Sequence, residues 1–138
     1  MKKITVPAKL EYIDEILDFV NGELEKADCS MKMQAKIDIA LDEIFTNIAS
    51  YAYQDSDPGD VTVKATIKKN PLSMQIQFID GGKPYNPLEN EDPDITLSAE
   101  DRDIGGLGIF IAKEFMDSME YVYKNKKNIL TIQKSDKI

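Results

Sequence analysis

The sequence predicts a two-layer α/β (α+β) fold, in which helices pack on one face of a mixed, mostly antiparallel sheet. Two early segments repeat apolar residues at helical spacing, and two later segments alternate apolar and polar residues. Clean alternation is typical of antiparallel strands with one buried and one solvated face. Because a helix and a sheet each bury one apolar side, the two kinds of segment are expected to pack together.

The first part of the chain is expected to form a short strand followed by two helices. The strand lies around Ile4 and Val6, and the first helix is expected over 9–26. Ser30 is a suitable N-cap for the second helix, expected over roughly 31–53. The apolar stripe of that helix comprises Met33, Ile37, Ala40, Leu41, Ile44 and Ile48. Both helices therefore have an apolar face to set against the sheet.

Two strands and a long connection make up the middle of the chain. Strands are expected over 61–67 and 72–78, on either side of a turn at Asn70-Pro71. The connection over 83–104 is rich in proline and acidic residues. Loops longer than about 12–15 residues inside a compact domain are usually functional or disordered. A third helix is expected over 106–117.

The chain closes with a hairpin of strands over 119–124 and 129–133, turning through Asn125–Asn128. No repeat or low-complexity linker divides the sequence. A length of 138 residues with 42% hydrophobic content is enough for one self-sufficient core. The sequence therefore predicts a single domain over residues 1–138.

Composition excludes several classes of protein. The formal net charge is −8, which argues against direct nucleic-acid binding, because that needs a contiguous basic surface. No apolar run approaches the roughly 18 residues of a membrane span, and the N-terminus lacks the apolar segment of a signal peptide. The single cysteine, Cys29, cannot form an internal disulfide. We therefore expect a cytoplasmic protein that binds neither nucleic acid nor membrane.

The absence of histidine limits the available chemistry. It excludes Ser-His-Asp and Cys-His catalysis, the usual zinc sites and phosphohistidine chemistry. A P-loop is absent as well, because Gly82-Lys83 is followed by Pro84 and lacks the upstream glycine. Any ATP site in this chain must therefore be of another design.

Three short motifs carry the functional signal. D-E-I-F-T-N at 42–47 places Glu43 and Asn47 four residues apart, and therefore on one face of the second helix. D-G-G-K-P at 80–84 places an acid at the end of an apolar strand, before a flexible turn. G-G-L-G at 105–108 opens an apolar helix, whose free N–H groups can hold phosphate oxygens. Each motif alone also fits a structural role, but together they indicate a nucleotide site.

The order of these motifs resembles the N-box and the two glycine boxes of the gyrase/histidine-kinase-type (GHKL) ATPase superfamily. The three matching segments are Glu43-x-x-x-Asn47, Asp80-x-Gly82 and Gly106-x-Gly108. Within the superfamily the chain is most similar to the small bacterial anti-sigma-factor serine/threonine kinases. That similarity lies in the segments D-G-G-K-P-Y-N-P-L, G-G-L-G-I-F-I-A-K and M-D-S-M-E-Y. The resemblance implies a Bergerat-type ATP-binding fold.

The resemblance also implies how ATP and Mg²⁺ would be bound. Asp80 would accept a hydrogen bond from the adenine amino group, and Gly82 would let the backbone approach the base. Asn47 would offer its amide oxygen to a Mg²⁺ that also bridges phosphate oxygens. The phosphates would be held at the start of the third helix by the backbone of Gly105, Gly106, Leu107 and Gly108.

A phosphoryl-transfer centre is implied in the same way. Glu43 would act as general base toward a substrate serine or threonine hydroxyl. Residues 86–104 would form the ATP lid, with seven acidic residues against Arg102. Arg102, the only arginine, would neutralise charge on the γ-phosphate as a second catalytic residue. If the lid does not bring it close, Lys83 or Lys113 would have to substitute.

The chain departs from the family pattern at three places. The kinases commonly have a basic residue just before the second glycine box, where this chain has Ile104 and Gly105, and Arg102 is the candidate for that role. Tyr51 stands where the family often has a histidine, and Pro84 replaces a glycine of the first glycine box. The leading interpretation is a serine/threonine kinase that binds a sigma factor and phosphorylates a STAS-type anti-anti-sigma partner. The alternative is a non-catalytic module whose ATP or ADP state selects its partners; a plain ATP hydrolase comes third. The resemblance also allows a homodimer formed through the sheet.

Overall fold

The computed structural model describes residues 1–53, 59–89 and 106–136. A strand and two helices are followed by a pair of strands, a third helix and a second pair of strands, with two short 3-10 turns (η1 and η2) among them. The elements are β1 (Lys2–Pro7), η1 (Leu10–Tyr12), α1 (Ile13–Lys26), α2 (Met31–Tyr51), β2 (Asp60–Lys68), β3 (Ser73–Asp80), η2 (Pro87–Glu89), α3 (Gly106–Phe115), β4 (Ser118–Lys124) and β5 (Lys127–Ser135).

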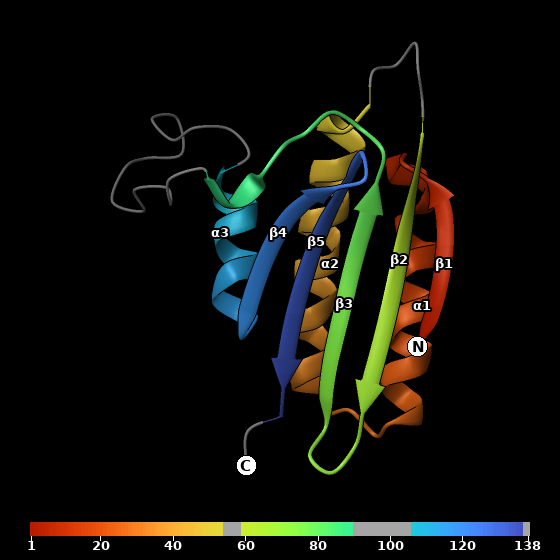
Figure 1. The fold of residues 1–138 in the computed structure, drawn as a ribbon. Helices are drawn as coiled ribbons and strands as arrows, with labels where there is room; N and C mark the ends of the chain where they lie inside the picture. The colour runs from red at the N-terminus through yellow and green to blue at the C-terminus, as the bar shows by residue number, and fades with distance from the viewer. Residues whose placement is uncertain (54–58, 90–105, 137–138) are drawn as a thin grey trace.

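The strands form a single sheet in the order β1-β2-β3-β5-β4, and the helices lie on one side of it (Figure 1). The predicted two-layer arrangement is therefore confirmed. All four pairings between the described strands are antiparallel, so the parallel pair of a mixed sheet is not found there. The reason is the path after α3. The chain enters β4 and then returns as β5, which lies between β4 and β3 and separates them.

The second helix begins as its cap predicts. The Ser30 hydroxyl accepts a hydrogen bond from the Met33 backbone N–H at 3.1 Å, which satisfies one free donor of the first turn. Most of the predicted apolar stripe of α2 is buried against the sheet, and Ile48 at its end is half-buried. The helix ends at Tyr51, slightly before the expected limit. In α1 the first predicted turn is the separate 3-10 turn η1.

The alternating strands bury the predicted face. The buried residues of β2 and β3 are Val61, Val63, Ala65, Met74, Ile76, Phe78 and Asp80. Asp80 is thus the one acid among the core-facing residues of these two strands. Among the described residues no helix is both long and apolar enough to cross a membrane.

The C-terminal hairpin turns earlier than expected. Asn125 and Lys126 both have positive φ, at 54° and 63°, and form a tight turn between β4 and β5. Such turns match the twist of the paired strands. Asn128, which was expected to belong to the turn, therefore lies within β5. There it is paired in register with Asp80 of β3 on one side and with Tyr123 of β4 on the other.

Candidate functional site

Asp80 ends β3 with its carboxylate inside the protein, and only 5% of the residue is exposed. Period-two alternation places it on the same face as Phe78, which points to the helix layer. Its Oδ1 accepts two hydrogen bonds of 2.9 Å, from the Gly82 backbone N–H and from Asn128 Nδ2. Within the described part of the chain no hydrogen bond reaches Oδ2. One carboxylate oxygen is fixed by the protein, and the other is left for a ligand.

Asn128 ties the end of the sheet to the loop that follows β3. Besides Asp80, its Nδ2 donates to the Lys83 carbonyl at 2.9 Å. Its Oδ1 accepts from the Tyr85 backbone N–H at 3.2 Å and from the Tyr121 hydroxyl. Asn128 is 6% exposed, and with Asp80 it makes up the buried polar or charged residues of the described chain. A buried amide with these partners holds the loop in place.

The sequence pattern did not single out Asn128 as a site residue. A signal was available, because Asn128 precedes the core residues Leu130 and Ile132 at a spacing of two. Continuing the strand backward by two residues would have placed its amide on the buried face. Because the turn was expected to extend to Asn128 but ends at Lys126, the start of the strand and its register were not recognised.

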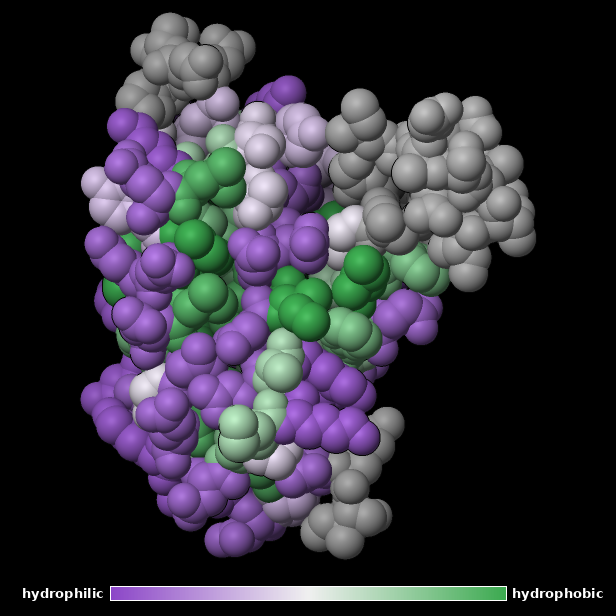
Figure 2. Space-filling model, turned by 180° about the vertical axis from the view of Figure 1, so that it is seen from behind, coloured by the Kyte–Doolittle hydropathy of each residue, from purple (hydrophilic) through white to green (hydrophobic). Residues whose placement is uncertain are grey.

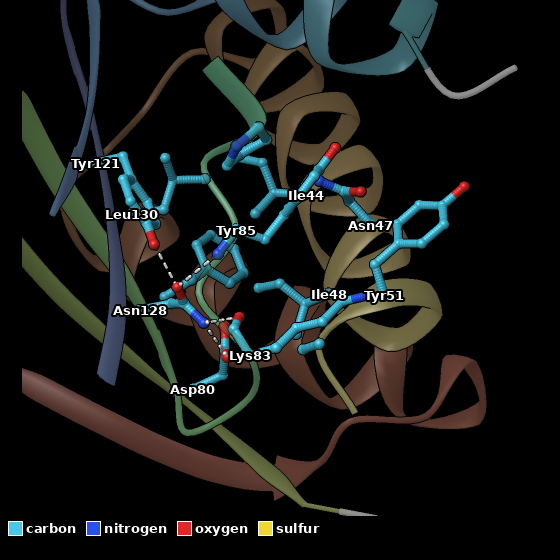
Figure 3. Close-up of a pocket in the computed structure, with 13 residues that line it drawn as sticks. Ile44, Asn47, Ile48, Tyr51, Asp80, Lys83, Tyr85, Tyr121, Asn128 and Leu130 are labelled. Atoms are coloured by element: carbon cyan, nitrogen blue, oxygen red, sulfur yellow. Dashed lines mark hydrogen bonds between the residues drawn. The ribbon is translucent and has the colours of Figure 1, made fainter. Parts of the chain in front are cut away.

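A pocket of about 30 Å³ opens beside Asp80, between the end of α2 and the sheet (Figure 3). Its walls come from α2, β3, the following loop and the C-terminal hairpin. The lining residues are Ile44, Asn47, Ile48, Tyr51, Ala52, Phe78, Asp80, Lys83, Tyr85, Pro87, Tyr121, Asn128 and Leu130. The volume suits about one water molecule. A planar ligand therefore has to displace side chains at the pocket wall.

Two tyrosine rings line the pocket next to each other. The rings of Tyr51 and Tyr85 lie 6.2 Å apart between centroids and are tilted by 40°. Tyr51 belongs to α2 and is 44% exposed, whereas Tyr85 belongs to the loop after β3. An aromatic ligand in this pocket would meet ring faces and aliphatic side chains, with Asp80 as its polar partner.

Asn47 lines the same pocket as Asp80, so the structure brings the first two motifs together. Figure 3 shows it on the α2 side, opposite Asp80 and Asn128. The described residues contain no group of three or more acids or cysteines that could hold a metal ion by itself. An amide oxygen is a suitable ligand for Mg²⁺, which commonly takes one or two protein oxygens beside phosphates and water. Asn47 therefore fits a metal that arrives with an anionic ligand.

Glu43 lies one turn before Asn47 and meets the start of α3. A Cβ added to Gly108 would overlap Glu43 Oε2, so the Glu43 carboxylate lies directly against the first turn of α3 and would have to turn away from any larger residue there. Burial raises the pKa of the Glu43 carboxyl, and the negative charge of Asp42 raises it further. A half-buried acid with a raised pKa is a better proton acceptor than an ordinary glutamate.

Gly82 has a packing role that the sequence did not reveal. A Cβ at this position would overlap the backbone carbonyl of Ala52, at the end of α2. The next residue, Lys83, donates its backbone N–H to the same carbonyl at 3.1 Å. The loop after β3 therefore packs directly against the C-terminus of α2, and the lack of a side chain at Gly82 permits it.

The remaining predicted residues are described in part or not at all. Gly106 and Leu107 begin α3. Arg102 and Gly105 lie outside the described residues, as does the predicted lid beyond the turn η2. Of the two lysines named as substitutes for Arg102, Lys83 lines the pocket, and Lys113 lies on α3.

Comparison with known proteins identifies relatives over nearly the whole chain. The family model described as "Histidine kinase-like ATPase domain" matches residues 6–134. The chain is 30% identical over 128 residues to the serine-protein kinase RsbW of Listeria monocytogenes serotype 4a, covering 88% of this chain and 80% of that protein. It is 24% identical over 103 residues to the serine/threonine-protein kinase BtrW of Bordetella bronchiseptica, covering 75% and 71%.

A solved structure supports the fold alone. The histidine kinase domain of the Erythrobacter litoralis EL346 blue-light activated histidine kinase superposes with a TM-score of 0.58 at 14% identity. The match covers 93% of this chain and 60% of that chain.

Proposed function

Because the chain belongs to the histidine kinase-like ATPase domain family, we propose that it is a protein serine/threonine kinase that binds Mg-ATP. Its substrate is a serine or threonine on a STAS-type anti-anti-sigma protein, and its other partner is a sigma factor. One observation carries the proposal. A buried acid with a free carboxylate oxygen shares a pocket with Asn47, one helical turn from a glutamate whose pKa is raised.

The adenine end of the site comprises Asp80, Asn128 and the pocket beside them. The unbonded Oδ2 of Asp80 accepts a hydrogen bond from the adenine amino group. A base that has a carbonyl oxygen in place of this amino group cannot donate such a bond. The base displaces the side chains that narrow the pocket, and its faces contact apolar and aromatic groups. This end accounts for selective binding of adenine nucleotides.

The phosphate end comprises Glu43, Asn47 and the start of α3 at Gly106 and Gly108. The N–H groups of the first turn of a helix favour phosphate oxygens, and α3 begins at Gly106. Asn47 is the described side chain that would hold Mg²⁺, and the ion supplies charge neutralisation for the phosphates. Arg102 remains part of the proposal as a second cationic group toward the γ-phosphate.

Glu43 performs the proton chemistry. Its carboxylate accepts the proton of the acceptor hydroxyl while the new bond to phosphorus forms and the bond to the ADP oxygen breaks. Burial keeps the carboxylate poorly solvated, and the neighbouring Asp42 charge adds to its basicity. General-base catalysis of this kind typically contributes roughly 10²–10⁴-fold to the rate.

A second function is favoured by one observation. The Glu43 carboxylate lies against Gly108, and it cannot approach an acceptor hydroxyl unless its side chain turns away from α3. A chain in which it stays there would bind nucleotide and partners without transferring phosphate. That is the nucleotide-dependent binding module.

The test incubates the protein with ATP labelled at the γ-phosphate and with each purified STAS-domain protein of the same genome, with Mg²⁺ or with EDTA. We expect label on a serine or threonine of one STAS protein with Mg²⁺ and none with EDTA. ATP binding without transfer would support the binding module. A chain that fails to bind ATP in calorimetry would contradict both.

A further inference from the structure

The first half of α2 carries exposed apolar side chains on its outer face. Met31 is 87% exposed and Ile39 is 42% exposed, and Ala35 between them is exposed as well. Because they are spaced by four residues, they form one ridge along the helix surface. We call these three residues the α2 ridge. In Figure 2, which views the helix layer, apolar groups run along this face between hydrophilic ones.

The row of the α2 ridge continues to the proposed catalytic residue and turns by about 40° around the helix with each step of four residues. The same spacing of four continues from Ile39 to Glu43 and then to Asn47, which lines the pocket. At a rise of about 1.5 Å per residue, Ile39 lies about 6 Å along the axis from Glu43, and Met31 about 18 Å. A protein that covers the ridge therefore brings its neighbouring residues to the phosphate end.

The α2 ridge borders acidic residues on its α1 side, whereas Lys32 and Lys36 lie on its other side. A groove at the junction of α1 and α2 is lined by Glu25, Asp28 and Asp38 together with Met31 and Ala35. Asp42 follows Asp38 by four residues and is exposed. None of these four acids forms a salt bridge with the described residues. Over residues 9–53 as a whole, ten acidic residues stand against four lysines.

We infer that the α2 ridge is the docking surface for the phosphoacceptor protein, which presents to it an amphipathic helix with lysine or arginine beside its apolar residues. The inference rests on the proposed kinase function and adds the surface by which the substrate is chosen. Apolar contact anchors the helix, and the acids on the α1 side of the ridge select a basic partner. Continuity of the ridge with Glu43 assigns the surface to the phosphoacceptor rather than to another partner.

The test uses single substitutions on the full chain with the STAS protein that accepts phosphate. Ile39→Lys and Met31→Lys each replace an apolar contact with a charge that repels a basic partner. The matched control is Val122→Lys, because Val122 is 48% exposed but lies on the edge strand β4. Because the Met31 side chain is exposed, we expect Met31→Lys to fold normally, and the thermal unfolding temperature checks this.

We expect both ridge variants to raise the KM for the STAS protein roughly tenfold. The kcat at saturating partner and the affinity for Mg-ATP stay within about twofold of wild type, because no group touching the nucleotide changes. Val122→Lys leaves all three values unchanged. We also expect the affinity of the wild-type chain for the STAS protein to fall at high salt. Calorimetry in the presence of a non-hydrolysable ATP analogue measures that affinity.

The outcomes separate the two proposals. Normal transfer with an unchanged KM in both ridge variants would overturn the docking surface and leave the kinase function intact. Loss of sigma-factor binding without any change in KM would likewise overturn it, because the ridge would then serve the other partner. Failure of the wild type to phosphorylate any STAS protein would remove the kinase proposal, and the docking surface with it.

Discussion

The two ends of the candidate site are held in different ways. At the adenine end, Asp80 and Asn128 are buried in the sheet and joined by a 2.9 Å hydrogen bond, and Asn128 also fixes the following loop through Lys83 and Tyr85. At the phosphate end, Glu43 is half-buried on a helix and meets α3 through a glycine. The first end is formed by paired strands, and the second by the packing of two helices.

The difference suits two different roles, recognition of the base at one end and phosphoryl transfer at the other. A network of satisfied buried hydrogen bonds is rigid, and such rigidity suits selective recognition of one base. A carboxylate at the end of a flexible side chain can turn away from α3 without moving the backbone, which suits a centre that must admit an acceptor hydroxyl. We therefore expect substitutions at the adenine end to change binding and stability, and substitutions at the phosphate end to change rate.

The largest effect is expected at the phosphate end. Glu43→Gln keeps the shape of the side chain and removes its ability to take a proton, so phosphotransfer should fall roughly 10²–10⁴-fold. The affinity for Mg-ATP should stay within a few-fold. The adjacent Asp42→Asn serves as the control and should retain most of the activity at neutral pH. Label transfer at the wild-type rate in Glu43→Gln would show that another group is the base.

At the adenine end, Asp80→Asn should weaken ATP binding roughly 100-fold. The Gly82 N–H and Asn128 Nδ2 both donate to Oδ1 of Asp80. The side-chain amide of the Asp80→Asn variant therefore places its oxygen at this position and turns its NH₂ group toward the pocket. That donor then faces the adenine amino group. The affinity for GTP, which has an acceptor oxygen in place of the adenine amino group, should fall much less. Calorimetry with both nucleotides measures the change, and an unaltered ATP affinity would rule out the role of Asp80.

The network itself can be removed with Asn128→Ala. Asp80 Oδ1 and the Lys83 carbonyl each lose a donor, and the Tyr121 hydroxyl loses its acceptor, so the free energy of unfolding should fall by about 2–3 kcal/mol. Gln75→Ala, which removes an exposed bond to Gln133, is the control and should change it by less than about 0.5 kcal/mol. Equal denaturation midpoints for the two variants would mean that the network does not hold this end.

Two glycine substitutions test the packing of the loop on α2. Gly82→Ala should destabilise the protein by about 1–3 kcal/mol, because its Cβ meets the Ala52 backbone. Gly22→Ala should stabilise it by about 0.5–1 kcal/mol, because Gly22 lies within α1 and has no atom within 4 Å of an added Cβ. Thermal unfolding compares the two. If Gly82→Ala is as stable as wild type, the loop is not constrained as described.

The smallest effect concerns pH. Glu43 must be ionised to act as base, and burial and Asp42 raise its pKa, so transfer should decline with falling pH at a midpoint above that of an ordinary glutamate. Asp42→Asn removes one of the two causes and should move this midpoint to lower pH. The pH profile of kcat/KM measures the shift. A midpoint that does not move would indicate that a group other than Glu43 limits the rate on the acid side.

The local elements of the fold could be predicted because their signals lie close together in the chain. The hydroxyl of Ser30 and the N–H that it caps are three residues apart, and the alternation of β2 and β3 repeats every two residues. The motif spacing of Glu43 and Asn47 is likewise fixed by a single helical turn. Such relations depend on backbone geometry alone, and the structure reproduces them.

The sequence by itself thus determined the layers, the cap, the buried end of β3 at Asp80 and the family to which the chain belongs. Only the tertiary structure placed Asn128 beside Asp80, 48 residues away, because β5 lies between β3 and β4. It alone set Gly82 against Ala52 and Glu43 against Gly108. These contacts join segments that are far apart in the sequence and are not linked by any helical or strand repeat. They therefore depend on the order of the strands and on the close packing of the layers.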